Sequence, residues 1–179
     1  MTVRAWGRLA LVIVVTVFAQ VGLANGLVIE GAHPDLFLLV AVVAGLMAGP
    51  QRGAVIAFVV GLVADLFVVT PFGLSALVYV LVAFGVGAAA SLAGGRAPYS
   101  FRMVMAAAGG IAGVLLFAGI GVLIGQPQLP SHQLLAVVGV VAIANALLAL
   151  PAAMLMSWAV SSGPASRELA PSSGGSALR

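Results

Sequence analysis

The sequence predicts an all-α, polytopic membrane protein: a six-helix transmembrane bundle with no soluble domain of any size. The first observation behind this prediction is composition. Of 179 residues, 63% are hydrophobic and only 6% are charged, whereas a soluble domain usually carries about a quarter charged residues. The second observation is the length of the apolar runs. A membrane-spanning helix takes about 20 residues, so the chain has room for about six.

Glycine, proline and charged residues divide the apolar sequence into six segments. We expect transmembrane helices at residues 5–28, 34–48, 53–69, 71–92, 103–124 and 133–160. Together these helices make residues 1–160 a six-span transmembrane domain. Residues 161–179 are rich in Ser, Gly, Ala and Pro and lack an apolar period, so we expect a disordered cytoplasmic tail.

The basic residues predict the orientation of the chain in the membrane. All of them are arginines, at positions Arg4, Arg8, Arg52, Arg96, Arg102, Arg167 and Arg179. With six spans, all seven fall on the same side of the bilayer. Because loops with an excess of positive charge stay in the cytoplasm, we expect both termini to be cytoplasmic.

Two alternatives to this arrangement stay open. Residues 1–24 have the outline of a cleaved signal peptide, with a small-residue site at Gly22-Leu23-Ala24, although the apolar run continues beyond that site. The second and third spans are short, because residues 34–48 would rise only ~22 Å as a helix against a hydrocarbon core of ~30 Å. The pair could be a re-entrant hairpin. Its tip carries Arg52, however, which favours a pair that reaches the cytoplasmic interface.

Asp65 is the one charged residue that lies beyond the first turn of a predicted span, which makes it a functional candidate. Just beyond it, Thr70 suits a helix N-cap and Pro71 suits the first residue of the next helix. We expect the exposed amides at that helix start to bind the Asp65 carboxylate and pin a tight outer hairpin. Proton coupling or cation binding at Asp65 is the alternative.

Other polar residues in the spans favour structural roles. Asp35 follows Pro34 in the first turn of a predicted helix, where a carboxylate complements the helix dipole. Thr16 and Gln20 share one face of the first span, and Asn145 lies deep in the last. Interhelical hydrogen bonding is the usual role of such residues.

The sequence gives no basis for an enzyme or for a cofactor. It has no cysteine, no recognisable catalytic motif and only two histidines, His33 and His132, which are too far apart in the chain to predict a metal site. The arginines are scattered singly, which is not the pattern of a nucleic-acid-binding surface. We therefore predict no catalytic residues, no metal, no cofactor and no nucleic-acid partner.

Small residues recur at the G-x-x-x-G spacing that allows transmembrane helices to approach closely. The pairs are Gly22 and Gly26, Gly45 and Gly49, Gly109 and Gly113, and Gly121 and Gly125. This spacing indicates a compact bundle.

A series of short motifs between residues 33 and 79 resembles the rod shape-determining protein MreD family. Pro34-Asp35-Leu36 opens a helix, Arg52-Gly53 makes a basic turn, Gly61 and Asp65 form G-x-x-x-D, and residues 71–77 read P-x-G-L-x-A-L. Phe58 and Tyr79 also fit the series. The order and spacing of the motifs make the resemblance fairly specific, and the length and span count of the chain agree with it.

The resemblance implies a function that composition does not. MreD-like proteins are non-enzymatic components of the cell-elongation machinery in the bacterial inner membrane. They associate with MreC and help to organise the glycosyltransferase/transpeptidase pair that extends peptidoglycan. On this basis the structural or partner-binding candidates are Pro34, Asp35, Arg52, Gly61, Asp65, Pro71 and Gly73. The family is also considered similar in fold to the substrate-binding subunits of energy-coupling factor vitamin transporters, which supplies an alternative function.

Overall fold

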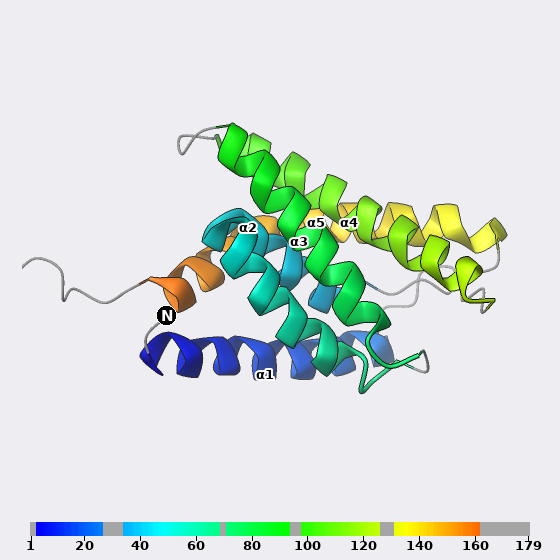
Figure 1. Cartoon of the computed structure of the whole chain (residues 1–179), viewed down its shortest axis with the longest axis horizontal. Helices are drawn as coiled ribbons and strands as arrows, with labels where there is room; N and C mark the ends of the chain where they lie inside the picture. The colour runs from blue at the N-terminus through cyan, green and yellow to red at the C-terminus, as the bar shows by residue number, and fades with distance from the viewer. Residues whose placement is uncertain (1–2, 27–33, 69–70, 94–97, 126–130, 162–179) are drawn as a thin grey trace, which may run out of the picture.

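The residues that the structure describes form five helical elements. The structure, a computed structural model, describes residues 3–26, 34–68, 71–93, 98–125 and 131–161. The helices are α1 (Val3–Gly26), α2 (Leu36–Ala64), α3 (Leu74–Leu92), α4 (Tyr99–Leu123) and α5 (Ser131–Val160) (Figure 1). All five are long and apolar enough to cross a membrane, and the described residues contain no strand. The all-helical membrane class is therefore confirmed.

The predicted count of six helices is not confirmed, and α2 is the reason. The segments expected as separate second and third spans follow each other without a loop at residues 49–52, so that α2 consists of two helices that meet at a kink. Its backbone leaves the helical region only at Gly49, where φ is 79° and ψ is 176°. Glycine adopts this positive φ without a Cβ clash, and Pro50 is already set for the first turn of a new helix.

The break at Gly49 reverses the direction of the chain. The rings of Phe37 and Phe67, which flank the two ends of α2, stack with their centroids 6.0 Å apart. In a straight helix their separation of thirty residues would span roughly 45 Å. The element is therefore a hairpin, with a first arm (residues 36–48) and a second arm (residues 50–64). That each arm crosses the bilayer stays a prediction.

Glycines let the arms and α3 meet backbone to backbone. A Cβ added to Gly53 would lie 2.6 Å from the Cα of Gly45, and one added to Gly87 would lie 2.8 Å from the Cα of Pro50. Such close contacts replace the hydrophobic effect, which does not drive helices together in lipid. The predicted close-approach role therefore holds for Gly45, whereas a Cβ at Gly22 would meet nothing within 4 Å.

The α2 hairpin is the centre of the bundle. The residues Ala41, Val42, Val43 and Ala44 are completely buried. The side chain of Val42 lies against α4, because a Cβ on Gly109 would meet it at 2.9 Å. The other helices surround the hairpin, and Figure 1 shows α1 along one side of it.

Arg8 joins the first turns of α1 to the end of α5. Its Nη1 donates to the carbonyl oxygens of Trp158, at 3.0 Å, and Ser161, at 3.3 Å. The guanidinium also lies 4.9 Å from the centroid of the Trp158 ring, within the range of a cation–π contact. The start of α1 therefore lies beside the end of α5, as a chain with both termini on one side requires. Which side of the membrane this is stays a prediction.

Several sequence-based expectations lie outside the described residues. These concern Glu30, His33, Thr70, Arg96, the side chain of His132, and the tail from residue 162 onward with Arg167 and Arg179.

Two glycines on α3 test the packing directly. We expect Gly87→Ala to lower the free energy of unfolding by about 1–3 kcal/mol, because its Cβ would press on the backbone of Pro50. Gly85→Ala is the matched control, since a Cβ there meets nothing within 4 Å. Thermal unfolding of the purified protein in detergent measures both. Equal melting temperatures for the two variants would contradict the packing described here.

Candidate functional site

Asp65 caps the start of α3 from outside that helix. It follows the last residue of α2 and is 5% exposed. Its Oδ2 accepts from the amide of Gly73 at 2.8 Å and from that of Ala76 at 3.4 Å, and its Oδ1 accepts from the amide of Ser75 at 3.0 Å. The contact that the sequence predicts between this carboxylate and the next helix start is therefore present. Buried amides at a helix start need such a partner, because no water reaches them in the bilayer.

The predicted start of α3 was wrong. The N-cap is Gly73, with φ of 99°, and the first helical residue is Leu74 rather than Pro71. Pro71 is exposed before the helix, and its carbonyl accepts from the Leu74 amide at 3.1 Å. Local preference favoured a cap at residue 70. The Asp65 carboxylate supplies the cap from another element, so the helix begins where Asp65 can reach it.

Gly61 explains why Asp65 can reach α3. A Cβ at Gly61 would lie only 2.4 Å from the Cα of Ala76 and 3.0 Å from the carbonyl carbon of Ser75. The second arm of α2 thus touches the first turn of α3. Asp65 lies four residues after Gly61, one turn further along the same face. The G-x-x-x-D spacing therefore combines a close approach with a cap.

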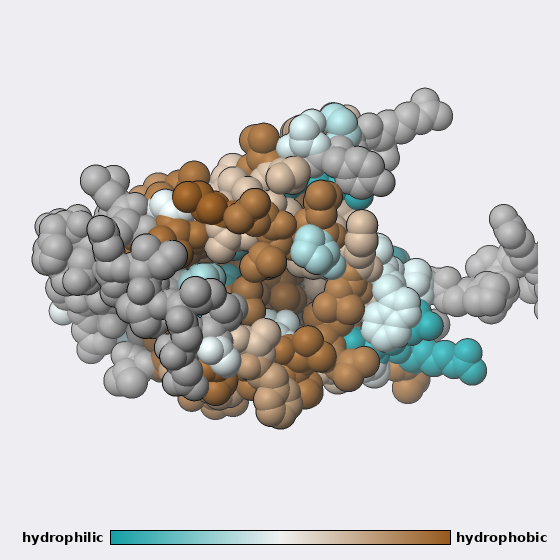
Figure 2. All heavy atoms as spheres, turned by 180° about the vertical axis from the view of Figure 1, so that it is seen from behind, coloured by the Kyte–Doolittle hydropathy of each residue, from teal (hydrophilic) through white to brown (hydrophobic). Residues whose placement is uncertain are grey.

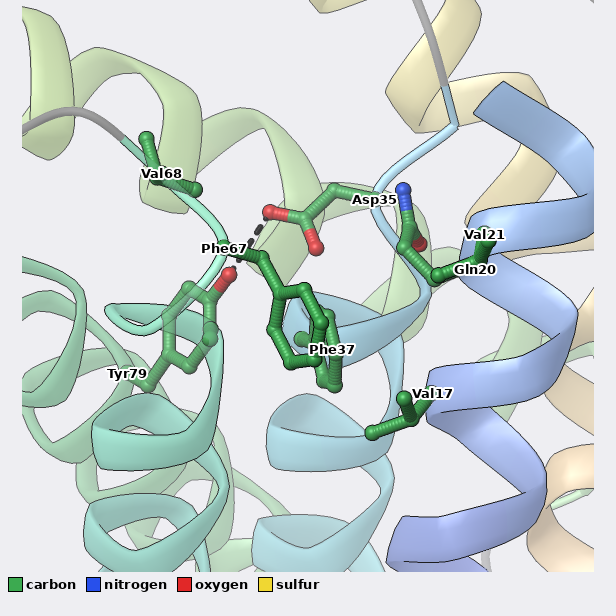
Figure 3. A pocket seen from close by; sticks show the side chains of 9 residues that line it. Val17, Gln20, Val21, Asp35, Phe37, Phe67, Val68 and Tyr79 are labelled. Atoms are coloured by element: carbon green, nitrogen blue, oxygen red, sulfur yellow. Dashed lines mark hydrogen bonds between the residues drawn. The ribbon is translucent and has the colours of Figure 1, made fainter. Parts of the chain in front are cut away.

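Asp35 forms the second cap of the site. It precedes α2 and accepts from the amide of Leu38 at 2.9 Å, as expected for a carboxylate at a helix start. Its other oxygen accepts from the hydroxyl of Tyr79 on α3 at 2.8 Å (Figure 3). Burial raises the pKa of the Asp35 carboxyl above its usual range, because desolvation outweighs the hydrogen bonds to the charged form.

Gln20 attaches α1 to the same region. Its amide nitrogen donates to the carbonyl oxygen of Pro34 at 3.0 Å, and its amide oxygen accepts from the amide of Leu36 at 2.8 Å. Gln20 thus makes the predicted interhelical bonds. The prediction was wrong for Thr16, whose hydroxyl donates to the Val12 carbonyl of its own helix at 2.8 Å.

Asn145 makes a similar contact on the far side of the bundle. Its side chain is buried, and its amide nitrogen donates to the carbonyl of Ala106 at 3.4 Å. The bond joins α5 to α4, which agrees with the predicted interhelical role.

A cavity of about 310 Å³ lies between α1, the two ends of the α2 hairpin and α3. Its walls are mostly apolar. The lining residues are Val17, Gln20, Val21, Asp35, Phe37, Ala64, Phe67, Val68 and Tyr79. Figure 3 shows the side chains of α1 on one side of it and Tyr79 on the other, with the Asp35 carboxylate between them. Sequence reasoning did not find this cavity, because its residues come from three separate segments and most are ordinary apolar ones.

The structure brings most of the candidate residues together. Asp35 lines the cavity, Pro34 is held by Gln20, and Gly61, Asp65 and Gly73 meet at the start of α3. Pro71 lies between Asp65 and Gly73 along the chain. Arg52 does not join them, because it is exposed in the first turn after the hairpin tip. Within the described ranges, no group of three or more potential metal ligands is present.

The arrangement of caps, glycines and cavity falls on the motif series noted in the sequence. The family model of the rod shape-determining protein MreD matches residues 2–159. The chain belongs to the MreD family. The match runs from the residue before α1 to the last turn of α5, so the suspected resemblance is confirmed over almost the whole transmembrane part of this MreD protein.

Neither a curated protein nor a solved structure matches the chain. The expected likeness of this MreD protein to the vitamin-binding subunits is therefore not confirmed. The family itself identifies a membrane component involved in determining cell shape.

The Asp65 cap is tested by truncation. We expect Asp65→Ala to lower the free energy of unfolding by about 2–3 kcal/mol, because three amides lose their acceptor. Asp65→Asn keeps one acceptor oxygen, so its loss should be smaller. Tryptophan fluorescence during thermal unfolding in detergent measures both. Ser157→Ala, which removes an exposed hydroxyl bonded within its own helix, is the control. An Asp65→Ala protein as stable as that control would rule out the cap.

The same position separates a cap from proton coupling. An asparagine cannot ionise, so a proton-coupled mechanism would stop in Asp65→Asn, whereas a cap would only weaken. We expect Asp65→Asn to restore normal cell shape in a host depleted of the native protein, as scored by microscopy. Complete failure at wild-type protein levels would favour proton coupling.

Tyr79→Phe tests the bond between α3 and the start of α2. The variant removes one hydrogen bond to Asp35 and leaves the ring in place. We expect a loss of about 1 kcal/mol in unfolding free energy, the usual size for such a bond in a membrane protein. In the Asp35→Asn background the same substitution should cost less, which a double-mutant cycle by thermal unfolding will show. Additive losses would mean that the two side chains do not interact.

Proposed function

We propose that this protein is a non-enzymatic component of the bacterial cell-elongation machinery in the inner membrane. It binds an MreC-like partner and thereby helps to organise the glycosyltransferase/transpeptidase complex that extends peptidoglycan. The observation that carries this proposal is the match of the MreD family model over residues 2–159. With both termini cytoplasmic, as the arginines predict, the cavity end of the bundle faces the outside, where peptidoglycan is made.

The roles of the polar residues support a binding function. Asp65 is bonded to backbone amides, Asp35 to an amide and to Tyr79, and Gln20 to the Pro34–Leu36 turn. These groups hold helices together. The helices that they join border a mostly apolar cavity. A cavity of this kind suits an anchoring side chain from another protein.

The surface beside the cavity supports the same reading. The turn that leads from α2 towards α3 exposes large apolar side chains: Leu66 (71% exposed), Phe67 (53%), Val68 (44%) and Phe72 (68%). Exposed apolar clusters of this kind mark contacts with proteins or lipid. Two of the four, Phe67 and Val68, also line the cavity. We therefore place the partner's apolar segment, close to the membrane surface, on this turn with one side chain in the cavity.

The alternative is a substrate-binding subunit of an energy-coupling factor vitamin transporter. The observation that favours it is the cavity volume of about 310 Å³, at the lower end of the range of small-molecule sites. The polar groups of Asp35 and Gln20 are already used within the protein, which leaves few to recognise a vitamin. A clear rise in melting temperature on addition of a vitamin would favour this alternative.

Filling the cavity tests the proposed partner contact. We expect Val21→Trp to reduce capture of an MreC-like partner by roughly tenfold or more, because the indole occupies the space for the anchoring side chain. Phe18→Trp is the matched control: it lies three residues away on α1, is 75% exposed and does not line the cavity. Crosslinking in native membranes, followed by identification of the partners, measures capture. Equal capture by the two variants would place the contact elsewhere.

Depletion in the host tests the cellular role. We expect depleted cells to lose their elongated shape and the normal pattern of new wall insertion, as seen by fluorescent labelling of peptidoglycan. Re-expression of the Phe18→Trp variant should restore both, and Val21→Trp should not. Cells of unchanged shape and wall insertion after full depletion would count against the proposal.

A further inference from the structure

The helix α1 forms one wall of the cavity, and it packs unevenly. Its buried side chains are Ala5, Leu9, Val12 and Thr16, one for each turn. They all lie in the part of the helix nearer its N-terminus. From residue 17 to residue 22 no side chain of α1 is buried. There the helix borders the cavity through Val17, Gln20 and Val21, and only the partly buried Val17 packs against the core.

The two ends of α1 are attached in different ways. At the N-terminal end, Arg8 makes two charge-assisted hydrogen bonds to the last carbonyls of α5 and stacks on Trp158. At the cavity end, the described contacts are the two neutral hydrogen bonds of Gln20 to Pro34 and Leu36. In lipid, helices stay together through packing and hydrogen bonds alone. Among the described residues, the cavity end of α1 is therefore held by the packing of Val17 and by the hydrogen bonds of Gln20.

We propose that α1 is a lateral gate: it pivots about the Arg8–Trp158 contact, and release of Gln20 opens the cavity sideways to the bilayer. The proposal rests on the proposed function and names the route by which the partner reaches the site. A partner held in the bilayer by its own helix approaches in the membrane plane. Opening of this wall admits its apolar side chain, and its backbone meets the Pro34 carbonyl and the Leu36 amide that Gln20 leaves.

Chemical access to the cavity tests the gate without any partner. The chain has no cysteine, so Ala64→Cys places a single thiol in the cavity wall. Ala64 lines the cavity and is only 1% exposed. The protein is reconstituted in phosphatidylcholine and phosphatidylglycerol vesicles and treated with a bilayer-soluble maleimide. We expect Gln20→Leu to raise the alkylation rate about tenfold, since both hydrogen bonds at the cavity end of α1 are lost.

The control for this measurement lies on the same helix. Thr16→Val removes a buried hydroxyl that bonds only within α1, so we expect the alkylation rate to stay unchanged. Equal rates in the parent, Gln20→Leu and Thr16→Val backgrounds would overturn the gate. Size-exclusion profiles and melting curves show whether each variant is folded.

Locking the gate is the second test, and it does not depend on the stability of Gln20→Leu. Gln20→Cys with Leu36→Cys, joined by a cleavable thiol crosslinker, fixes the cavity end. Arg8→Cys with Ser161→Cys, joined in the same way, fixes the pivot and is the matched control. We expect the first lock to abolish capture of an MreC-like partner until the linker is cleaved, and the second lock to leave capture unchanged.

The outcomes of the two tests separate the gate from the function on which it rests. Normal capture with the cavity end locked overturns the gate and leaves the proposed function standing. If the uncrosslinked protein captures no partner at all, the proposed function fails, and the alkylation rates then decide alone whether α1 opens.

Discussion

The three amides that donate to Asp65 set where α3 meets the α2 hairpin. Within the bilayer these amides have no water to act as a hydrogen-bond acceptor. The first turn of α3 therefore lies where this carboxylate reaches it. That position places Tyr79, one turn further along α3, beside Asp35, which begins the other arm of the hairpin. Asp65 and the Asp35–Tyr79 pair thus connect both ends of α2 to α3 by hydrogen bonds. These bonds can form because Gly61 allows the backbones of α2 and α3 to touch.

The helix α1 takes no part in these bonds between α2 and α3, and the cavity lies between α1 and that pair. The α2 hairpin and α3 pack backbone to backbone, and the central residues of the hairpin are fully buried. A mostly apolar recess remains at the open end of the hairpin, and α1 covers it without filling it. Tight and loose packing therefore occur side by side in the same end of the bundle.

Sequence reasoning was most successful where the physics is local or compositional. Apolar content predicted the class, and a lone carboxylate before a helix start predicted the Asp65 contact. The joint expected at Gly49-Pro50 is also present, although the chain reverses at one residue rather than over a loop. Sequence reasoning failed where tertiary contacts overrule local preference. Thr70-Pro71 is a good local start for a helix, yet Asp65 moves the start to Leu74. A cavity is a lack of contact between distant segments, and no local pattern records it.

The dependence of Asp65 on α3 has a consequence for how the protein is made. When the second arm of α2 leaves the translocation channel, its last residue is followed by a carboxylate whose partners have not yet been inserted. Those partners begin at Gly73, only eight residues later. A carboxylate without hydrogen-bond partners is costly in lipid, which favours entry of the hairpin and α3 into the membrane as one unit. The short interval between Asp65 and Gly73 keeps the uncompensated stage brief during synthesis.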